Sequence, residues 1–146
     1  MNCIVIIPAR SGSKRIKNKN IKFFQKKPII SIVIKKLKKT KFFRNIYVST
    51  DSKEISDIAI KYGANIIRLR DPELSSDSVT FGDLMKYDVP FYSELCESNE
   101  CLFVLPTAAM IRQQTLKDAY KLYKNQDCEI VMSTKLINAH WALEQK

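Results

Sequence analysis

Short apolar runs rich in β-branched residues alternate along the chain with segments of helical periodicity. The first run, residues 4–7, is apolar at every position, which is typical of a strand buried on both faces of a sheet. Comparable runs predict strands at residues 45–50, 65–69, 101–105 and 129–133. Because strands separated by helices pair in parallel, this alternation predicts an α/β fold, a Rossmann-like three-layer sandwich with a mostly parallel sheet. Its central strand should be residues 4–7, flanked by residues 45–50 and 101–105.

Two helices are predicted with clear boundary residues. The first covers residues 29–39 after Pro28, which suits a first helical turn. One face of this helix carries apolar residues at helical spacing, with one lysine: Ile29, Ile32, Val33 and Lys36. The second helix begins after the capping residues Asp51 and Ser52, and it ends at Gly63, which suits the left-handed conformation after a helix.

Two later helices are predicted with less regular ends. One runs through Phe81 and beyond, with Asp77 or Ser78 as its N-cap, and Pro90 should kink or interrupt it. The other covers residues 115–123, with its first residue as N-cap.

Basic residues are concentrated at the start of the chain. The formal net charge is +10, and residues 1–50 contain 14 Lys and Arg and no carboxylate. Such a one-sided field concentrates anionic ligands. Part of it is expected to be the solvated end of the first helix: Lys35, Lys36, Lys38, Lys39 and Lys41. A basic nucleic-acid-binding module is one interpretation, but no recognition-helix motif is present and the aromatic residues fall mostly on predicted core positions.

Size and hydropathy fit one domain with a buried core, since the chain has 146 residues and a mean hydropathy of -0.21. No apolar run approaches the roughly 20 residues that cross a bilayer. The first basic residue, Arg10, follows the opening apolar run, unlike the order in a signal peptide. We therefore expect a cytoplasmic protein without a membrane partner. Four cysteines without C-x-x-C spacing and one histidine argue against a zinc site.

The candidate site is the loop that follows the first strand. In α/β sheets the loop after the carboxyl end of a strand is where ligands bind. Ser11, Gly12 and Ser13 are small enough for close backbone approach, and cations surround them: Arg10, Lys14, Arg15, Lys17 and Lys19. This composition predicts a polyphosphate site. The loop matches neither a Walker A motif nor G-x-G-x-x-G, so a solvated basic turn is the alternative on spacing alone.

Residues 7–20 carry a longer pattern, I-P-A-R-S-G-S-K-R-I-K-N-K-N. It resembles the signature I-P-A-R-x-G-S-K-R-x-x-x-K-N of the acylneuraminate cytidylyltransferases, the CMP-nonulosonic acid synthetases. Residues 70–77 and 106–109 resemble the family's R-P-x-E-L-x-x-D and P-T-[SA]-P segments. The resemblance implies a fold of the nucleotide-diphospho-sugar transferase type. It also implies transfer of CMP from CTP to a nine-carbon, sialic-type sugar acid, with release of pyrophosphate and no nucleic-acid partner.

By position in these motifs, the resemblance implies a set of nucleotide-binding residues: Arg10, Ser11, Gly12, Ser13, Lys14, Lys19, Asn20, Arg70 and Thr80. Arg10 and Lys14 are the implied catalytic residues. The implied cofactor is Mg²⁺, whose aspartate ligands in the family lie beyond the matched segments, so the metal ligands of this chain stay unknown.

Family members usually continue past this length. We therefore expect residues 1–146 to be the N-terminal, nucleotide-binding part of a nucleotidyltransferase domain whose C-terminal portion is missing. We expect this part alone to transfer CMP poorly. The family is expected to form homodimers, here through the apolar residues 139–143.

Departures from the family pattern bear on the sugar. Where the sialic-acid branch usually has a glutamine contacting the nucleotide base, this chain has Leu105. With Lys17, Val79 and the pair Thr107–Ala108, this change points to the pseudaminic acid branch. A relative resembling the 3-deoxy-manno-octulosonate cytidylyltransferases is the second enzymatic interpretation.

Overall fold

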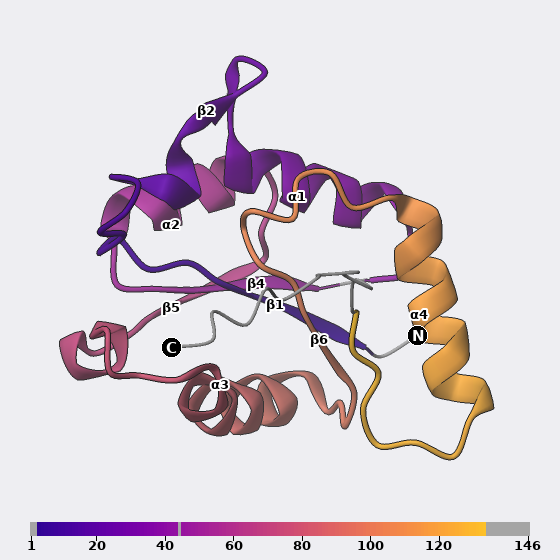
Figure 1. The fold of residues 1–146 in the computed structure, drawn as a ribbon. Helices are drawn as coiled ribbons and strands as arrows, with labels where there is room; N and C mark the ends of the chain where they lie inside the picture. Colours follow the sequence, from indigo (N-terminus) through magenta and orange to yellow (C-terminus); the bar gives the residue numbers. More distant parts are fainter. Residues whose placement is uncertain (1–2, 44, 134–146) are drawn as a thin grey trace, which may run out of the picture. The chain divides into compact units, whose positions relative to one another are not determined.

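A four-stranded parallel sheet organises the computed structural model, which describes residues 3–43 and 45–133. The strand order is β5-β4-β1-β6 (Figure 1). The elements in chain order are β1 (Ile4–Pro8), η1 (Lys19–Ile21), β2 (Phe23–Phe24), β3 (Lys27–Pro28), α1 (Ile29–Lys39), β4 (Ile46–Thr50), α2 (Lys53–Lys61), β5 (Ile66–Leu69), η2 (Pro72–Ser75), α3 (Phe81–Cys96), β6 (Cys101–Phe103) and α4 (Gln113–Asn125).

Strand β1 is the interior strand, as the sequence predicts. It pairs with β4 on one side, from Val5 opposite Ile46 to Pro8 opposite Ser49, and with β6 on the other. The four apolar residues of β1 are each at most 1% exposed. Burial on both faces explains why this run is apolar at every position instead of alternating with polar residues.

Helices cover both faces of the sheet, which confirms the three-layer fold. Figure 1 shows α1 and α2 on one face and α3 on the other. On the α3 side, Ile4 and Ile6 pack with Tyr47 of β4 and Tyr92 of α3. The two tyrosine rings stack with centroids 4.5 Å apart, so α3 is fixed to the middle of the sheet by aromatic contact.

The helices differ from the sequence prediction in local detail. The buried face of α1 is displaced from the predicted one and comprises Ile30, Val33, Ile34 and Leu37. The N-cap of α3 is Thr80, which forms a capping box with Asp83, so neither Asp77 nor Ser78 caps it. Helix α3 also continues through Pro90, because Tyr92 beyond the proline is held in the core.

Residues 129–133 form no strand, contrary to the sequence prediction. Ile130 and Met132 are 68% and 78% exposed, and an apolar run becomes a strand only where another edge accepts its backbone hydrogen bonds. The chain divides into two compact units, Met1–Gln113 and Gln114–Lys146. Helix α4 begins at Gln113, the last residue of the first unit and two residues before the predicted cap.

A short hairpin was not predicted. Strands β2 and β3 pair in antiparallel fashion, and Gln25 and Lys26 between them have φ angles of 49° and 62°. No helix in the described part of the chain is long and apolar enough to cross a membrane. The predicted association segment, residues 139–143, lies outside the described residues.

The β1 core makes a stability prediction. Truncation of the fully buried Ile6 in Ile6→Ala should lower the free energy of unfolding by about 2–5 kcal/mol, because the removed atoms leave a cavity between sheet and helix. The matched control is Ile60→Ala on α2, where the side chain is 54% exposed and the change should stay within about 0.5 kcal/mol. Urea denaturation followed by circular dichroism measures both. Equal losses for the two variants would contradict the central position of β1.

Candidate active site

A cleft opens where the carboxyl ends of the parallel strands meet. It has a volume of about 790 Å³ and is lined by the connections that follow β1, β5 and β6 and by the first turn of α3. The strand order reverses between β1 and β6, since β4 and β5 lie on one side of β1 and β6 lies on the other. Ligands of open α/β sheets bind at such a reversal. The topology therefore places the candidate site at the end of β1.

Most of the residues predicted to bind nucleotide meet in this cleft. Those that line it are Arg10, Ser13, Lys14, Lys19, Asn20 and Arg70. Ser11, Gly12 and Thr80 are not part of the lining, and Thr80 instead caps α3. The cations of one short motif thus converge with Arg70, which comes from a different strand end.

Arg10 is bonded to the connection that follows β5. Its Nη1 donates to the carbonyl oxygens of Ser76, at 2.9 Å, and Ser75, at 3.4 Å. Its Nη2 donates to Oδ1 of Asp77 at 2.5 Å. The carbonyl oxygen of Arg10 accepts a 2.7 Å hydrogen bond from Nδ2 of the buried Asn20. Side chain and backbone of Arg10 are therefore both held in place.

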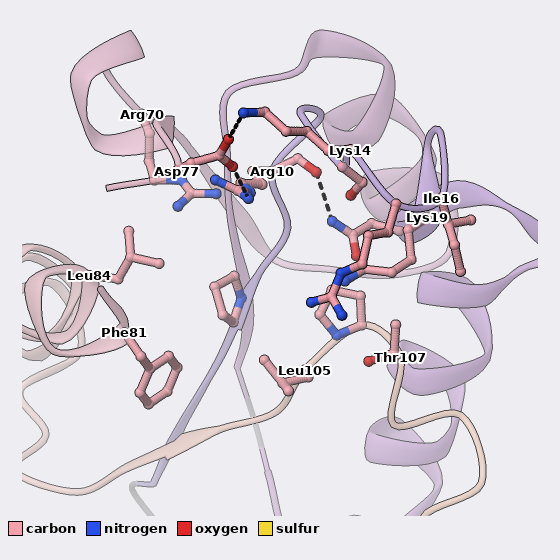
Figure 2. Close-up of a pocket in the computed structure, with 15 residues that line it drawn as sticks. Arg10, Lys14, Ile16, Lys19, Arg70, Asp77, Phe81, Leu84, Leu105 and Thr107 are labelled. Atoms are coloured by element: carbon pink, nitrogen blue, oxygen red, sulfur yellow. Dashed lines mark hydrogen bonds and ion pairs between the residues drawn. The ribbon is translucent and has the colours of Figure 1, made fainter. Parts of the chain in front are cut away.

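Asp77 is the counter-ion of the basic loop. Its carboxylate pairs with Lys14 as well as Arg10, and Figure 2 shows it between the two cations. The hydrogen bonds from Lys14 and then Arg10 hold the pKa of Asp77 below its usual range, so this carboxylate is ionised at neutral pH. An incoming polyphosphate would compete with Asp77 for the same two cations.

The small residues of the loop are arranged differently from an open cradle. The backbone N–H and the hydroxyl of Ser11 donate to Oδ1 and Oδ2 of Asp51, at 2.7 and 2.8 Å. Gly12 has a negative φ, and nothing lies within 4 Å of the place where a Cβ would sit. Asp51, at the end of β4, thus anchors the loop, and Ser13 is the one small residue of the three that faces the cleft.

Arg70 brings a buried guanidinium to the cleft wall. The residue is 6% exposed, and its Nε and Nη2 have no hydrogen-bond partner among the described residues. Burial lowers the pKa of Arg70, and the nearby carboxylate of Asp88 opposes this effect. Asp88 is fully buried, accepts a 2.9 Å hydrogen bond from Ser49 Oγ, and has its pKa raised by burial. Unpaired buried donors at a cleft wall are suited to bind an anion.

The cleft has an apolar part, of which sequence reasoning identified only Leu105, as a departure from the family pattern, and missed Phe81 and Leu84. Leu105 and Phe81 line it while 54% and 47% exposed, and Leu84 lies beside Phe81 on α3. Figure 2 shows Phe81 and Leu84 on one side of the cleft and Thr107 on the other, with Leu105 between them. The signal for Leu105 and Thr107 was present, because they lie at the carboxyl end of the predicted strand 101–105 and just after it. In the structure this strand, β6, ends at Phe103, so both residues lie in the connection that follows it.

The described residues do not form a magnesium site of their own. Residues 3–43 and 45–133 contain no cluster of three His, Cys, Asp or Glu side chains suited to a metal ion. Asp77 is the single carboxylate among the lining residues, and two cations already neutralise it. Mg²⁺ is usually held by one or two carboxylates together with substrate phosphates, and the described lining offers no carboxylate that is free of cations.

Comparison with known proteins gives the family. A family model described as Cytidylyltransferase matches residues 4–140. The chain belongs to the cytidylyltransferase family. It is 34% identical over 140 residues to a Helicobacter pylori protein named pseudaminic acid cytidylyltransferase and UDP-2,4-diacetamido-2,4,6-trideoxy-beta-L-altropyranose hydrolase, covering 95% of this chain and 27% of that protein. It is 33% identical over 145 residues to an N-acylneuraminate cytidylyltransferase of Streptococcus agalactiae, and the match covers 98% of this chain and 34% of that protein.

The chain therefore spans about a quarter to a third of the length of these two relatives. A solved structure of a CMP:2-keto-3-deoxy-manno-octonic acid synthetase complexed with CTP has the same fold, with a TM-score of 0.64 and 18% identity over 84% of this chain and 48% of that one. The predicted family and the predicted Rossmann-like fold are both confirmed.

The pairing of Asp77 yields a binding prediction. Asp77→Asn removes the charge that competes for Lys14 and Arg10, so the affinity for inorganic pyrophosphate should rise about two- to fivefold. The matched control is Asp57→Asn, whose carboxylate pairs with Lys53 on α2 outside the cleft lining, and which should leave the affinity unchanged. Isothermal titration calorimetry at low ionic strength measures both. A weaker affinity in Asp77→Asn would mean that this carboxylate orients the cations instead of competing with the ligand.

Proposed function

We propose that this chain is the nucleotide-binding part of a CTP-dependent cytidylyltransferase that transfers CMP to a nonulosonic acid and releases pyrophosphate. The observation that carries the proposal is the meeting of Arg10, Lys14 and Lys19 with the buried Arg70 in one cleft at the sheet reversal. The family assignment supplies the nucleotide and the reaction type. The names of the two relatives support a nonulosonic acid as acceptor.

The cations would bind the triphosphate along one wall of the cleft. Arg10 is held by its backbone and side-chain bonds, whereas the Lys14 side chain is 82% exposed and can follow the phosphates. In the reaction, the anomeric hydroxyl of the sugar loses its proton to solvent as its oxygen forms a bond to the α-phosphorus. The bond from that phosphorus to the bridging oxygen of pyrophosphate then breaks. Cations that face the phosphate oxygens neutralise the charge that develops on them.

The apolar residues would bind the nucleoside half. Leu105, Phe81 and Leu84 offer carbon surface on the part of the cleft away from the paired cations, as Figure 2 shows. A base ring stacks or packs against such surface, while phosphates do not. Mg²⁺ is implied by the family resemblance alone. Since the described residues do not fit a site for it, no step is assigned to the metal.

The acceptor sugar is proposed at the level of the class. The pseudaminic and neuraminic relatives are 34% and 33% identical to this chain, so similarity does not separate the two branches. The departures at Leu105 and Thr107–Ala108 favour the pseudaminic branch. An octulosonate acceptor is the alternative. The CTP-bound synthetase shares the fold at 18% identity, which carries no argument for the substrate of this chain.

A nucleotide panel tests the proposed function. Thermal shift with CTP, UTP, ATP and GTP, each with Mg²⁺, should show selective stabilisation by CTP. CMP transfer to a nonulosonic acid, measured beside sizing by light scattering, then tests activity and the proposed homodimer. Salt-sensitive binding of arbitrary DNA or RNA without selective CTP binding would favour the nucleic-acid-binding interpretation.

Substitution of the loop cations should separate a site from a diffuse field. Arg10→Ala and Lys14→Ala should each weaken CTP binding about 10- to 100-fold, since each removes a charge-assisted contact to phosphate. Lys38→Ala, at an exposed position of α1, should change the affinity less than about twofold. Fluorescence or calorimetric titration gives the three affinities. Equal losses in all three variants would show that no localised site exists.

A further inference from the structure

Lys36 on α1 makes contacts that distinguish it from the exposed lysines of the same helix. Its Nζ donates to the carbonyl oxygen of Ala109 and, at 3.2 Å, to that of Ile111. The side chain is half-buried, whereas Lys38 and Lys39 are exposed. From the sequence, Lys36 is predicted both on the apolar face of this helix and among its solvated lysines. In the structure it joins α1 to the connection that follows β6, which runs from the sheet to α1 in Figure 1.

This connection carries one wall of the cleft. Residues 104–112 belong to no helix or strand, and Leu105, Pro106 and Thr107 among them line the cleft. Few bonds determine their position. The N–H of Val104 donates to Ile6, which fixes the start of the connection, and a turn bond of 2.9 Å joins Ala108 N–H to the carbonyl of Leu105. The Lys36 ammonium ties this connection to α1.

The anchored carbonyl group depends on this ammonium. Ala109 is 3% exposed, so water has little access to it. Loss of the ammonium would leave a poorly hydrated acceptor without this charged donor, which favours movement of the connection toward solvent. The two accepting residues are Ala109 and Ile111. A turn bond of 3.0 Å from Ile111 N–H to the carbonyl of Ala108 closes the turn that contains Ala109, so this turn would move as a unit.

We infer that Lys36 is a positioning residue, which holds the connection after β6 against α1 and thereby sets the affinity for the nucleoside half of the nucleotide. The inference rests on the proposed function, because the proposed function assigns the phosphates to the basic loop and the nucleoside to the wall that contains Leu105. Lys36 itself does not line the cleft, so its effect passes through the connection. Lys36 should therefore affect binding of the nucleoside half of the nucleotide and leave binding of the phosphates unchanged.

The test compares CTP with inorganic tripolyphosphate. Lys36→Met keeps the aliphatic stem and removes the ammonium, and it should weaken CTP binding about tenfold while the affinity for tripolyphosphate changes less than about twofold. Retained tripolyphosphate binding also reports that the variant is folded. Lys36→Arg keeps a charged donor and should recover most of the CTP affinity. Lys39→Met, on the same helix and exposed, is the control and should bind both ligands like the unsubstituted chain.

Each result has a definite meaning. Equal weakening for CTP and tripolyphosphate in Lys36→Met would overturn the inference and indicate a general loss of charge or of fold. Unchanged CTP affinity in Lys36→Met would overturn it as well. Failure of the unsubstituted chain to bind CTP while it still binds tripolyphosphate would instead refute the proposed function, so the two failures are distinguishable. Calorimetry gives all the affinities, and thermal unfolding of the variants measures any loss of stability separately.

Discussion

Parallel pairing of β1 with both β4 and β6 is the constraint on which the rest of the structure depends. It covers both edges of β1 and places the strand inside the sheet, where helices cover both faces, so the strand can consist of apolar residues alone. It also brings the carboxyl ends of all four strands of the sheet to one edge. Residues from distant parts of the chain, such as Arg10, Arg70 and Leu105, meet in one cleft for this reason. Strand order therefore determines where the candidate site lies, and the sequence motif determines which side chains are placed there.

Charge compensation is the second constraint, because the basic loop carries cations that repel one another. Two carboxylates from the connections after neighbouring strands interact with this basic loop in different ways. Asp51 binds the backbone and hydroxyl of Ser11 and so holds the loop without neutralising its side chains. Asp77 pairs directly with Arg10 and Lys14. The hydrogen bonds between Asp51 and Ser11 can persist when an anion enters the cleft. The ion pairs of Asp77, in contrast, occupy the cationic groups that the anion would bind.

The sequence predicts well the elements whose signals are local. Apolar runs located the central strand, and boundary residues located the helix that ends before Gly63, where φ is +99°. Features that depend on tertiary partners were missed. Residues 129–133 have strand-like composition but form no strand. The sequence placed Lys36 beside the apolar face of its helix, but the carbonyl groups that it binds come from the connection after β6 and could not be predicted locally. In the candidate site, the motif predicted the cations. The apolar wall could be identified only once the strand order of the sheet was known.

The cations of the cleft are of two physical kinds, which has a consequence for binding. Arg70 is buried near the fully buried Asp88, and its Nε and Nη2 have no hydrogen-bond partner within residues 3–43 and 45–133. The fold therefore sets its position, and its desolvation has already occurred. Lys14 is exposed and must lose both Asp77 and side-chain freedom when it binds. A rigid, dehydrated cation selects where an anion can lie, and a flexible one adds attraction once the anion is there. Geometric selectivity in this cleft should therefore come mainly from Arg70 and the anchored Arg10, with Lys14 contributing mostly affinity.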